Sequence, residues 1–187
     1  IERLSLDQRP IDVSPASRSW RTNLPDRGQH QIALTLRGKV PAQRGGRGSR
    51  QATALGPDGG LLFERAGWIP ETGDDQVSYR LRVEVPVAYR AVATGRLDNE
   101  TIGQEVYSAT FTGDYPEASP SLFVGPYKVR EQRHDGIRIR TNFHRDLTNL
   151  SDIYLRDSAQ YLTRYATNIG PYPYSDFHII SAPIPVG

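Results

Sequence analysis

Residues 147–187, LTNLSDIYLRDSAQYLTRYATNIGPYPYSDFHIISAPIPVG, decide the fold because they hold the long helix signal of the sequence. Apolar, aromatic or small residues recur there at steps of three and four, and this spacing predicts one helix face turned toward a core. The residues expected on that face are Leu147, Leu150, Tyr154, Ser158, Tyr161, Tyr165 and Ile169.

The two ends of this helix also have sequence signals. Thr148, Asn149 or Ser151 is suited to cap its start, and Gly170-Pro171 is a typical stop, because glycine accepts the closing turn and proline cannot continue the helix. We expect a helix over about residues 149–169, roughly 30 Å long at 1.5 Å per residue. A short strand over 176–182 and a stiff proline-rich segment over 183–187 follow. A strand needs a neighbour, so we expect the chain to be a piece of a larger protein, called the parent below.

Before residue 145 the pattern changes to the alternation typical of strands. Residues 31–38 place Ile32, Leu34 and Leu36 on one face, and residues 79–86 alternate in the same way. Further short strands are predicted at 61–63, 91–96, 107–111, 122–129 with a break at Gly125-Pro126, and 136–143, after an extended lead-in over 1–30. The predicted fold class is mainly β: an antiparallel saddle-like or sandwich β domain of six to eight strands, followed by one long α-helix and a short strand. The change of period predicts a domain boundary, with domains at 1–145 and 146–187.

Composition narrows the function classes. The 187 residues contain no cysteine, which excludes disulfides, thiolate metal sites and cysteine nucleophiles. A net charge of +2 does not by itself indicate a polyanionic partner. No run approaches the roughly 18 apolar residues that span a bilayer, so we expect no membrane contact from this chain.

Two local features have a functional and a structural interpretation. Residues 37–50, RGKVPAQRGGRGSR, are basic enough for a nucleic-acid segment, but they contain no aromatic residue for base stacking. We favour a solvated hairpin loop and no nucleic-acid partner. Trp68 beside Ile69 and Pro70 is either a core tryptophan or a ligand-stacking aromatic, and we favour the core.

Catalytic patterns are missing from the sequence. His30, His134, His144 and His178 are far apart, and the motifs H-E-x-x-H, G-x-S-x-G and the P-loop do not occur. We interpret each histidine as structural or exposed. The paired acids Asp74-Asp75, and Asp98 near Glu100, are interpreted as solvated carboxylates of polar loops.

The order of these features resembles a known family. Residues 68–70 (WIP), 79–86 (YRLRVEVP), 123–129 (FVGPYKV), 141–143 (TNF) and 169–177 (IGPYPYSDF) follow one another as in the amino-terminal part of the membrane-alanyl-aminopeptidase family of zinc metallopeptidases. These are the gluzincin aminopeptidases, and the likeness is greatest to a bacterial branch. It covers about residues 31–187, and its most specific pieces are 123–129 and 170–187.

The resemblance implies that the two parts of this chain have different roles in the parent. Residues 1–145 would be the amino-terminal β domain that walls the substrate cleft, and 146–187 the truncated beginning of a thermolysin-like catalytic domain. The zinc ligands, the catalytic glutamate and the proton-donating tyrosine would lie after Gly187, in a parent that hydrolyses peptides with a zinc-activated water. This chain alone would then be inactive, with no catalytic residue, no metal site and no cofactor. Glu71 is the nearest candidate for contact with a substrate amine.

The implied partners are the downstream catalytic domain and, in the parent, a peptide substrate. An alternative from another class is a freestanding β-sandwich binding module for carbohydrate or protein, with Trp20, Trp68 and the tyrosines as its contact surface. The sequence after residue 187 would separate the two. Location is left open, and the cell envelope or secretion is compatible with such a parent.

Overall fold

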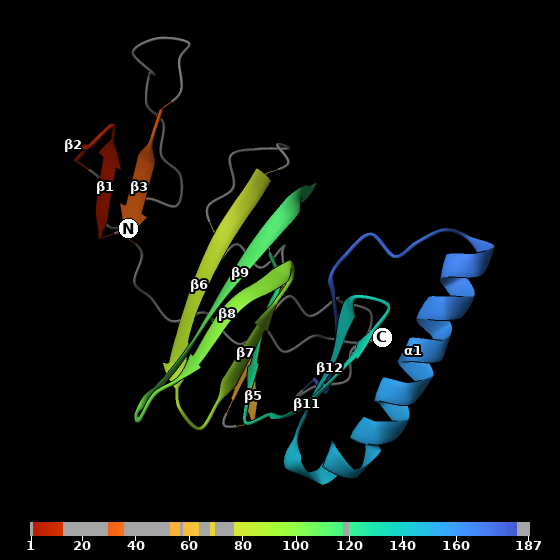
Figure 1. Ribbon diagram of the computed structural model, residues 1–187. Helices are drawn as coiled ribbons and strands as arrows, with labels where there is room; N and C mark the ends of the chain where they lie inside the picture. Colours follow the sequence, from red (N-terminus) through yellow and green to blue (C-terminus); the bar gives the residue numbers. More distant parts are fainter. Residues whose placement is uncertain are drawn as a thin grey trace, which may run out of the picture. The chain divides into compact units, whose positions relative to one another are not determined.

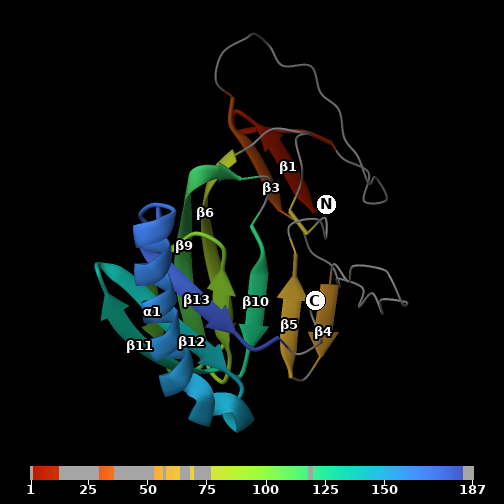
Figure 2. The same ribbon diagram turned by 90° about the vertical axis from the view of Figure 1, so that its right-hand side faces the viewer.

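Figures 1 and 2 show the computed structural model, which describes residues 2–12, 30–35, 53–56, 58–63, 68–69, 77–117 and 120–182. The chain divides into two compact units, Ile1–Val40 and Pro41–Gly187. Thirteen strands lie in the described ranges, more than the six to eight predicted, and the predicted mainly β fold class is confirmed. No helix among the described residues is long and apolar enough to cross a membrane.

The first unit is a small antiparallel sheet. Its strands are β1 (Arg3–Leu6), β2 (Arg9–Pro10) and β3 (Ile32–Thr35), in the order β2-β1-β3. Asp7 and Gln8 join β1 to β2 with positive φ angles of 49° and 66°, as a type I′ turn requires. The Asp7 carboxylate accepts hydrogen bonds from the Gln31 backbone N–H and the His30 ring, which lower its pKa.

One prediction for this unit is wrong. The alternation places Ile32 on a buried face, but its side chain is 49% exposed, whereas Leu4 on β1 is buried. The strand β3 pairs only with β1 among the described residues, so it is an edge strand of a sheet too small to cover both faces. Leu36, the third residue of the predicted face, lies outside the described residues.

The second unit contains three sheets, each named by its strand order. The β4-β5-β10-β7 sheet and the β6-β9-β8 sheet are antiparallel, and the β11-β12-β13 sheet joins an antiparallel pair to a parallel one. The bounds are β4 Thr53–Gly56, β5 Gly59–Leu62, β6 Val77–Pro86, β7 Arg90–Ala93, β8 Arg96–Ile102, β9 Val106–Glu117, β10 Leu122–Gly125, β11 Lys128–His134, β12 Ile137–Phe143 and β13 Asp176–Ile180.

The main apolar core lies between the β6-β9-β8 sheet and the sheet that contains β7 and β10 (Figure 1). Its buried members are Val83, Ala91, Ala93, Leu97, Tyr107, Ala109, Phe111 and Leu122. Phe111 is fully buried at its centre. Trp68 packs against this cluster, partly buried, as the core interpretation predicts.

The strand prediction is confirmed at the break after residue 125 and incomplete at β8. The chain leaves one sheet after β10 and enters another at β11, which is the interruption that Gly125-Pro126 predicts. The sequence pattern does not predict β8, because Asp98, Asn99 and Glu100 have low strand propensity. Its pairing with the long strand β9 determines its conformation, and a β-bulge at Asp98 accommodates an extra residue.

The chain from β12 to β13 forms a strand, helix, strand unit (Figure 2). A 3-10 turn, η2 (Arg145–Leu150), leads into α1 (Ser151–Asn168), and β13 then pairs in parallel with β12. Parallel pairing requires such a crossover connection, and α1 supplies it. The apolar cluster beneath α1 contains Ile139 of β12 together with Leu155, Ala159 and Leu162 of α1.

The predicted core-facing residues of the helix are wrong. α1 buries Ser151, Leu155, Ala159 and Leu162 instead. The small Ser151 and Ala159 let the helix approach β12 closely, whereas Tyr161 and Tyr165 are exposed and Tyr154 meets β12 through an edge-to-face contact with Phe143. Exposed fractions on the predicted face are 41% for Leu147, 36% for Leu150, 46% for Tyr154, 55% for Tyr161 and Tyr165, and 82% for Ile169.

The predicted helix end is confirmed, and the predicted cap is not. Gly170 has a φ of +148°, and its N–H and that of Ile169 both donate to the Tyr165 carbonyl, which closes the helix. At the start, the cap position is Leu150, which makes no side-chain cap hydrogen bond. The 3-10 turn continues directly into α1, so no side-chain cap is required there.

Candidate functional site

Charged side chains gather where β8 and β9 of one sheet meet β12 and β13 of another. On β12 the side chains alternate, so that Ile139 lies toward α1 while Arg138 and Arg140 lie on the opposite face. On β13, Asp176 and His178 lie on that same face. We call Glu100, Tyr107, Arg138, Arg140, Asp176 and His178 the inter-sheet network.

Arg140 is a buried arginine of the inter-sheet network, with 6% of its surface exposed. Its Nη2 donates to Glu100 Oε1 at 2.7 Å, and its Nε lies 3.4 Å from Glu131 Oε2 without hydrogen-bond geometry. Tyr107 O–H donates to Glu100 Oε2 at 2.7 Å. Burial alone would raise the pKa of Glu100, but the hydrogen bonds from Tyr107 and Arg140 outweigh it and the pKa is lowered. Glu100 therefore stays ionised and holds the two sheets together.

Tyr107 itself is locked in the neutral form. Burial is the largest cause that raises the pKa of its phenol well above the usual range, and the neighbouring Glu100 carboxylate raises this pKa further. The Arg90 guanidinium lies 4.9 Å from the centre of the Tyr107 ring, a cation–π contact. A phenol with a raised pKa donates its hydrogen bond at every ordinary pH, and it is not suited to act as a base.

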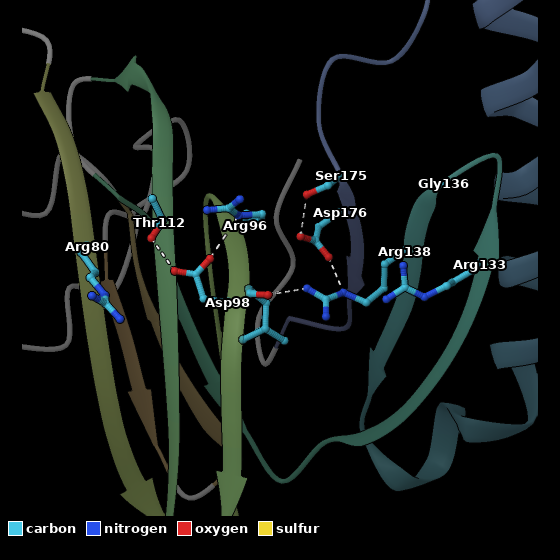
Figure 3. Close-up of a pocket in the computed structure, with 10 residues that line it drawn as sticks. Arg80, Arg96, Asp98, Thr112, Arg133, Gly136, Arg138, Ser175 and Asp176 are labelled. Carbon is cyan, nitrogen blue, oxygen red and sulfur yellow. Dashed lines mark hydrogen bonds and ion pairs between the residues drawn. The ribbon is translucent and has the colours of Figure 1, made fainter.

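Arg138 forms the second link between the sheets (Figure 3). Its Nε pairs with Asp176 Oδ1 on β13, and its Nη2 donates to the Leu97 carbonyl of β8 at 2.5 Å. Burial alone would lower the pKa of Arg138, but Asp176 outweighs it and the pKa is raised. One guanidinium thus fixes both the β13 register and the approach of β8.

His178 is the one member of the inter-sheet network without a hydrogen bond within the described part of the chain. Its side chain is 10% exposed, and both ring nitrogens are buried with no partner among the described residues. Nε2 lies 4.0 Å from Asp176 Oδ1, too far for a hydrogen bond. Burial, reinforced by the Arg140 charge, lowers the pKa of His178 to about 4. The ring faces a cavity of about 620 Å³ that Tyr172 and Tyr174 also line.

The other histidines have structural contacts, as predicted. His144 Nδ1 lies 2.7 Å from Ser181 Oγ and Nε2 2.7 Å from the Asp58 carbonyl. His134 Nε2 lies 2.6 Å from Thr163 Oγ1, which ties β11 to α1. His30 contacts Asp7 in the first unit.

A metal does not fit the residues that are described. Within these ranges no three histidine, cysteine, aspartate or glutamate side chains lie close enough to hold an ion. Within the inter-sheet network, His178 lies 4.0 Å from Asp176, and that carboxylate is already paired with Arg138. No zinc-dependent step is assigned to this chain.

The predicted site residues fall into two groups. Glu71, Asp74-Asp75, the basic residues 37–50 and the arm 183–187 all lie outside the described residues. The interpretation of Asp98 and Glu100 as solvated acids of a loop is wrong, because both lie on β8 and are paired. Asp98 pairs with Arg96 and accepts a hydrogen bond from Thr112.

Sequence reasoning misses the inter-sheet network because alternation shows which residues share a face but not what covers it. In residues 136–143 the arginines alternate with isoleucines, the pattern of a strand with one face in water. In the structure both faces of β12 are covered, one by α1 and the other by β8. The clue in the sequence is Glu100, a carboxylate that can neutralise one such arginine.

Comparisons with solved structures identify the fold. An M1 zinc metallopeptidase from Deinococcus radiodurans matches with a TM-score of 0.77 at 17% identity, over 98% of this chain and 46% of that chain. The same organism's enzyme bound to a Tyr-Ser-Ala substrate gives 0.74 at 18% identity, over 98% and 46%. Aminopeptidase A of Legionella pneumophila, in complex with aspartic acid, gives 0.70 at 13% identity, over 95% and 23%.

These matches define the class of fold. This chain has the fold of a part of the M1 zinc metallopeptidases. The structural match confirms the resemblance that the sequence motifs indicate. It spans under half the length of the solved chains that it matches. No protein-family profile and no curated protein matches the sequence.

Proposed function

We propose that this chain is the non-catalytic amino-terminal part of a zinc-dependent aminopeptidase, in which residues 1–145 wall the substrate cleft and 146–187 begin the catalytic domain. The observation that carries the proposal is the fold match. It covers 98% of this chain and 46% of each metallopeptidase chain. In the parent, zinc would be held by residues that follow Gly187.

The outer face of α1 supports a larger parent. Tyr154, Tyr161 and Tyr165 are between 46% and 55% exposed, Ile169 just after the helix is 82% exposed, and Ile153 is 45% exposed. Large apolar side chains gathered on one helix face usually mark a contact surface. β13 is also the edge strand of its sheet among the described residues, so its outer side is open to a further strand. Both features fit a catalytic domain that continues from this end.

The direct test compares this chain with its parent. Both are purified, zinc is measured by metal analysis, and hydrolysis is followed with amino-acyl chromogenic substrates. The parent is expected to contain one zinc per chain and to release the chromophore, and residues 1–187 alone to do neither. Stoichiometric zinc or clear turnover in residues 1–187 would overturn the assignment. A parent with no H-E-x-x-H after residue 187 would favour the freestanding binding module.

Glu71 provides a finer test of the cleft. If its carboxylate contacts the substrate amine, Glu71→Gln in the parent raises KM for substrates with a free amine and leaves zinc content unchanged. Glu84→Gln, an exposed glutamate on β6, is the matched control. Equal KM values for the two variants would contradict a contact between the Glu71 carboxylate and the substrate amine.

A further inference from the structure

A second cavity, of about 520 Å³, lies between the β6-β9-β8 sheet and the β11-β12-β13 sheet (Figure 3). It adjoins the tyrosine-lined cavity at His178, with which it shares Arg96, Thr112, Ser175 and Asp176, but arginine and aspartate dominate its own lining. The charged side chains around it are Arg80, Arg96, Asp98, Arg133, Arg138 and Asp176. Neither the fold match nor the proposed function gives this cavity a role.

The strand registers bring these charges together in two rows. On one wall, Arg80 of β6 and Arg96 of β8 are both paired with Thr112 of β9, so the three residues lie side by side across the sheet. On the other wall, Arg133 of β11 is paired with Arg138 of β12. Side chains directly opposite one another on neighbouring strands share a face, so both rows are fixed by the backbone.

The pairing of Arg133 with Arg138 is unfavourable by itself. Like charges directly opposite one another on neighbouring strands repel and destabilise the sheet. The Asp135-Gly136 turn holds them in place, because φ angles of 48° and 81° give a two-residue hairpin with a fixed register. The repulsion is therefore not relieved by a shift of the strands.

The carboxylates at the cavity are already engaged. Asp98 is held by Arg96 Nε at 3.1 Å and by Thr112 Oγ1 at 2.6 Å. Asp176 is held by Arg138 and by Ser175 Oγ, and Figure 3 shows these links as dashed lines. Arg80 and Arg133 have no ion pair within the described part of the chain. The described lining of the cavity thus has two positive charges more than negative ones.

We propose that this cavity binds a multivalent oxyanion. Arg80 and Arg133 supply the positive charge that no aspartate of the lining neutralises. Arg96 and Arg138, each held by an aspartate, line the cavity between them. The guanidinium fork matches phosphate and carboxylate oxygens in pairs, which makes arginine the preferred side chain for such ligands. The volume exceeds that of a single small anion, so a ligand with two linked anionic groups fits the two rows better than chloride does.

The test is calorimetric titration at constant ionic strength with pyrophosphate, citrate and chloride. Pyrophosphate and citrate separate a phosphate ligand from a polycarboxylate, and chloride measures general screening. Saturable binding of pyrophosphate or citrate is expected, with chloride showing none. The double variant Arg80→Gln with Arg133→Gln should bind the preferred anion at least about tenfold more weakly, since charge-assisted hydrogen bonds are lost.

The matched control is Arg82→Gln, which lies two residues from Arg80 on the same strand face and outside the cavity lining. It should change the affinity less than about twofold. Without ligand, Arg133→Gln alone should unfold at the same or a slightly higher temperature than the unmodified chain, because one repulsion is removed. No saturable binding of either polyanion, or equal affinities of the double variant and the control, would overturn the proposal.

Discussion

The two faces of β12 are held by different kinds of interaction. Toward α1, Ile139 is fully buried in an apolar cluster with Leu155 and Leu162. Toward β8, Arg138 and Arg140 make the contacts through ion pairs and hydrogen bonds. Apolar burial stabilises without strong directional preference, whereas a buried ion pair adds little net stability but is costly to break, because the remaining charge is left buried without its partner. We therefore infer that the helix side supplies most of the stability and that the charged side favours this one arrangement of the two sheets.

The largest effect is expected on the apolar face. Ile139→Ala should lower the free energy of unfolding by about 4 kcal/mol, since it deletes a fully buried side chain and leaves a cavity beneath α1. Urea denaturation followed by circular dichroism measures this. Ile137→Ala, at a half-buried position on the same strand, is the control and should cost clearly less. Equal losses at both positions would mean that Ile139 is not at the centre of the cluster.

On the charged face the effect should depend on the partner. Arg140→Met should cost about 3 kcal/mol, because Glu100 is left partly buried without its cation. The double variant Arg140→Met with Glu100→Leu should be more stable than Arg140→Met alone. The same denaturation experiment gives both values, and additive losses would show that the pair is not coupled.

The pH dependence of stability should reveal His178 on the same face. Its folded pKa of about 4 lies below the unfolded value of 6.5, so the unfolded chain binds more protons between these pH values. Stability is therefore complete above about pH 6.5 and falls as the pH is lowered toward 4, by about 2 kcal/mol at pH 5.

His178→Phe removes this titrating group and should flatten the change between pH 7 and pH 5 by that amount. Glu100 also contributes in acid, in the same direction, but its lowered pKa puts the loss at lower pH. Denaturation midpoints at pH 5 and pH 7 for the two proteins separate the contributions. If the variant showed the same dependence of stability on pH as the unmodified chain, the His178 ring would be solvated and its pKa would not be lowered by burial.

The smallest effect is expected on the outer face of α1. Tyr161→Gln with Tyr165→Gln should change the free energy of unfolding by less than about 0.5 kcal/mol, because both side chains are 55% exposed. Leu162→Gln, at a buried position of the same helix, should cost about 3 kcal/mol. Thermal unfolding compares them, and a large loss in the tyrosine variant would contradict the orientation of the helix.

The sequence allowed the fold class, the helix limits and most strand positions to be predicted, because these depend on local pattern. The orientation of α1 could not be predicted in that way. Tyr161 and Tyr165 count as apolar in a periodic pattern, but Ser151 and Ala159 are the residues small enough for close packing on β12. Which face is buried is decided by the partner, and the pattern of the helix does not contain that information.

The inter-sheet network could not be predicted from the sequence for a related reason. Glu100 and Arg140 are 40 residues apart and meet only because β8 and β12 belong to sheets that pack together. Strand propensity also argued against β8, where Asp98, Asn99 and Glu100 occur in succession. Residues of low propensity are accepted there because β9 provides the pairing on one side and Arg140 neutralises one charge.

The parallel pairing of β12 and β13 also sets an order of assembly. Arg138 and Asp176 are 38 residues apart, and the strands meet only after α1 has formed and closed the loop between them. β13 is therefore expected to join its sheet late in folding and to separate first in the native state. Amide hydrogens of β13 should exchange with solvent through local opening, while those of β9, paired on both sides, should exchange only on global unfolding.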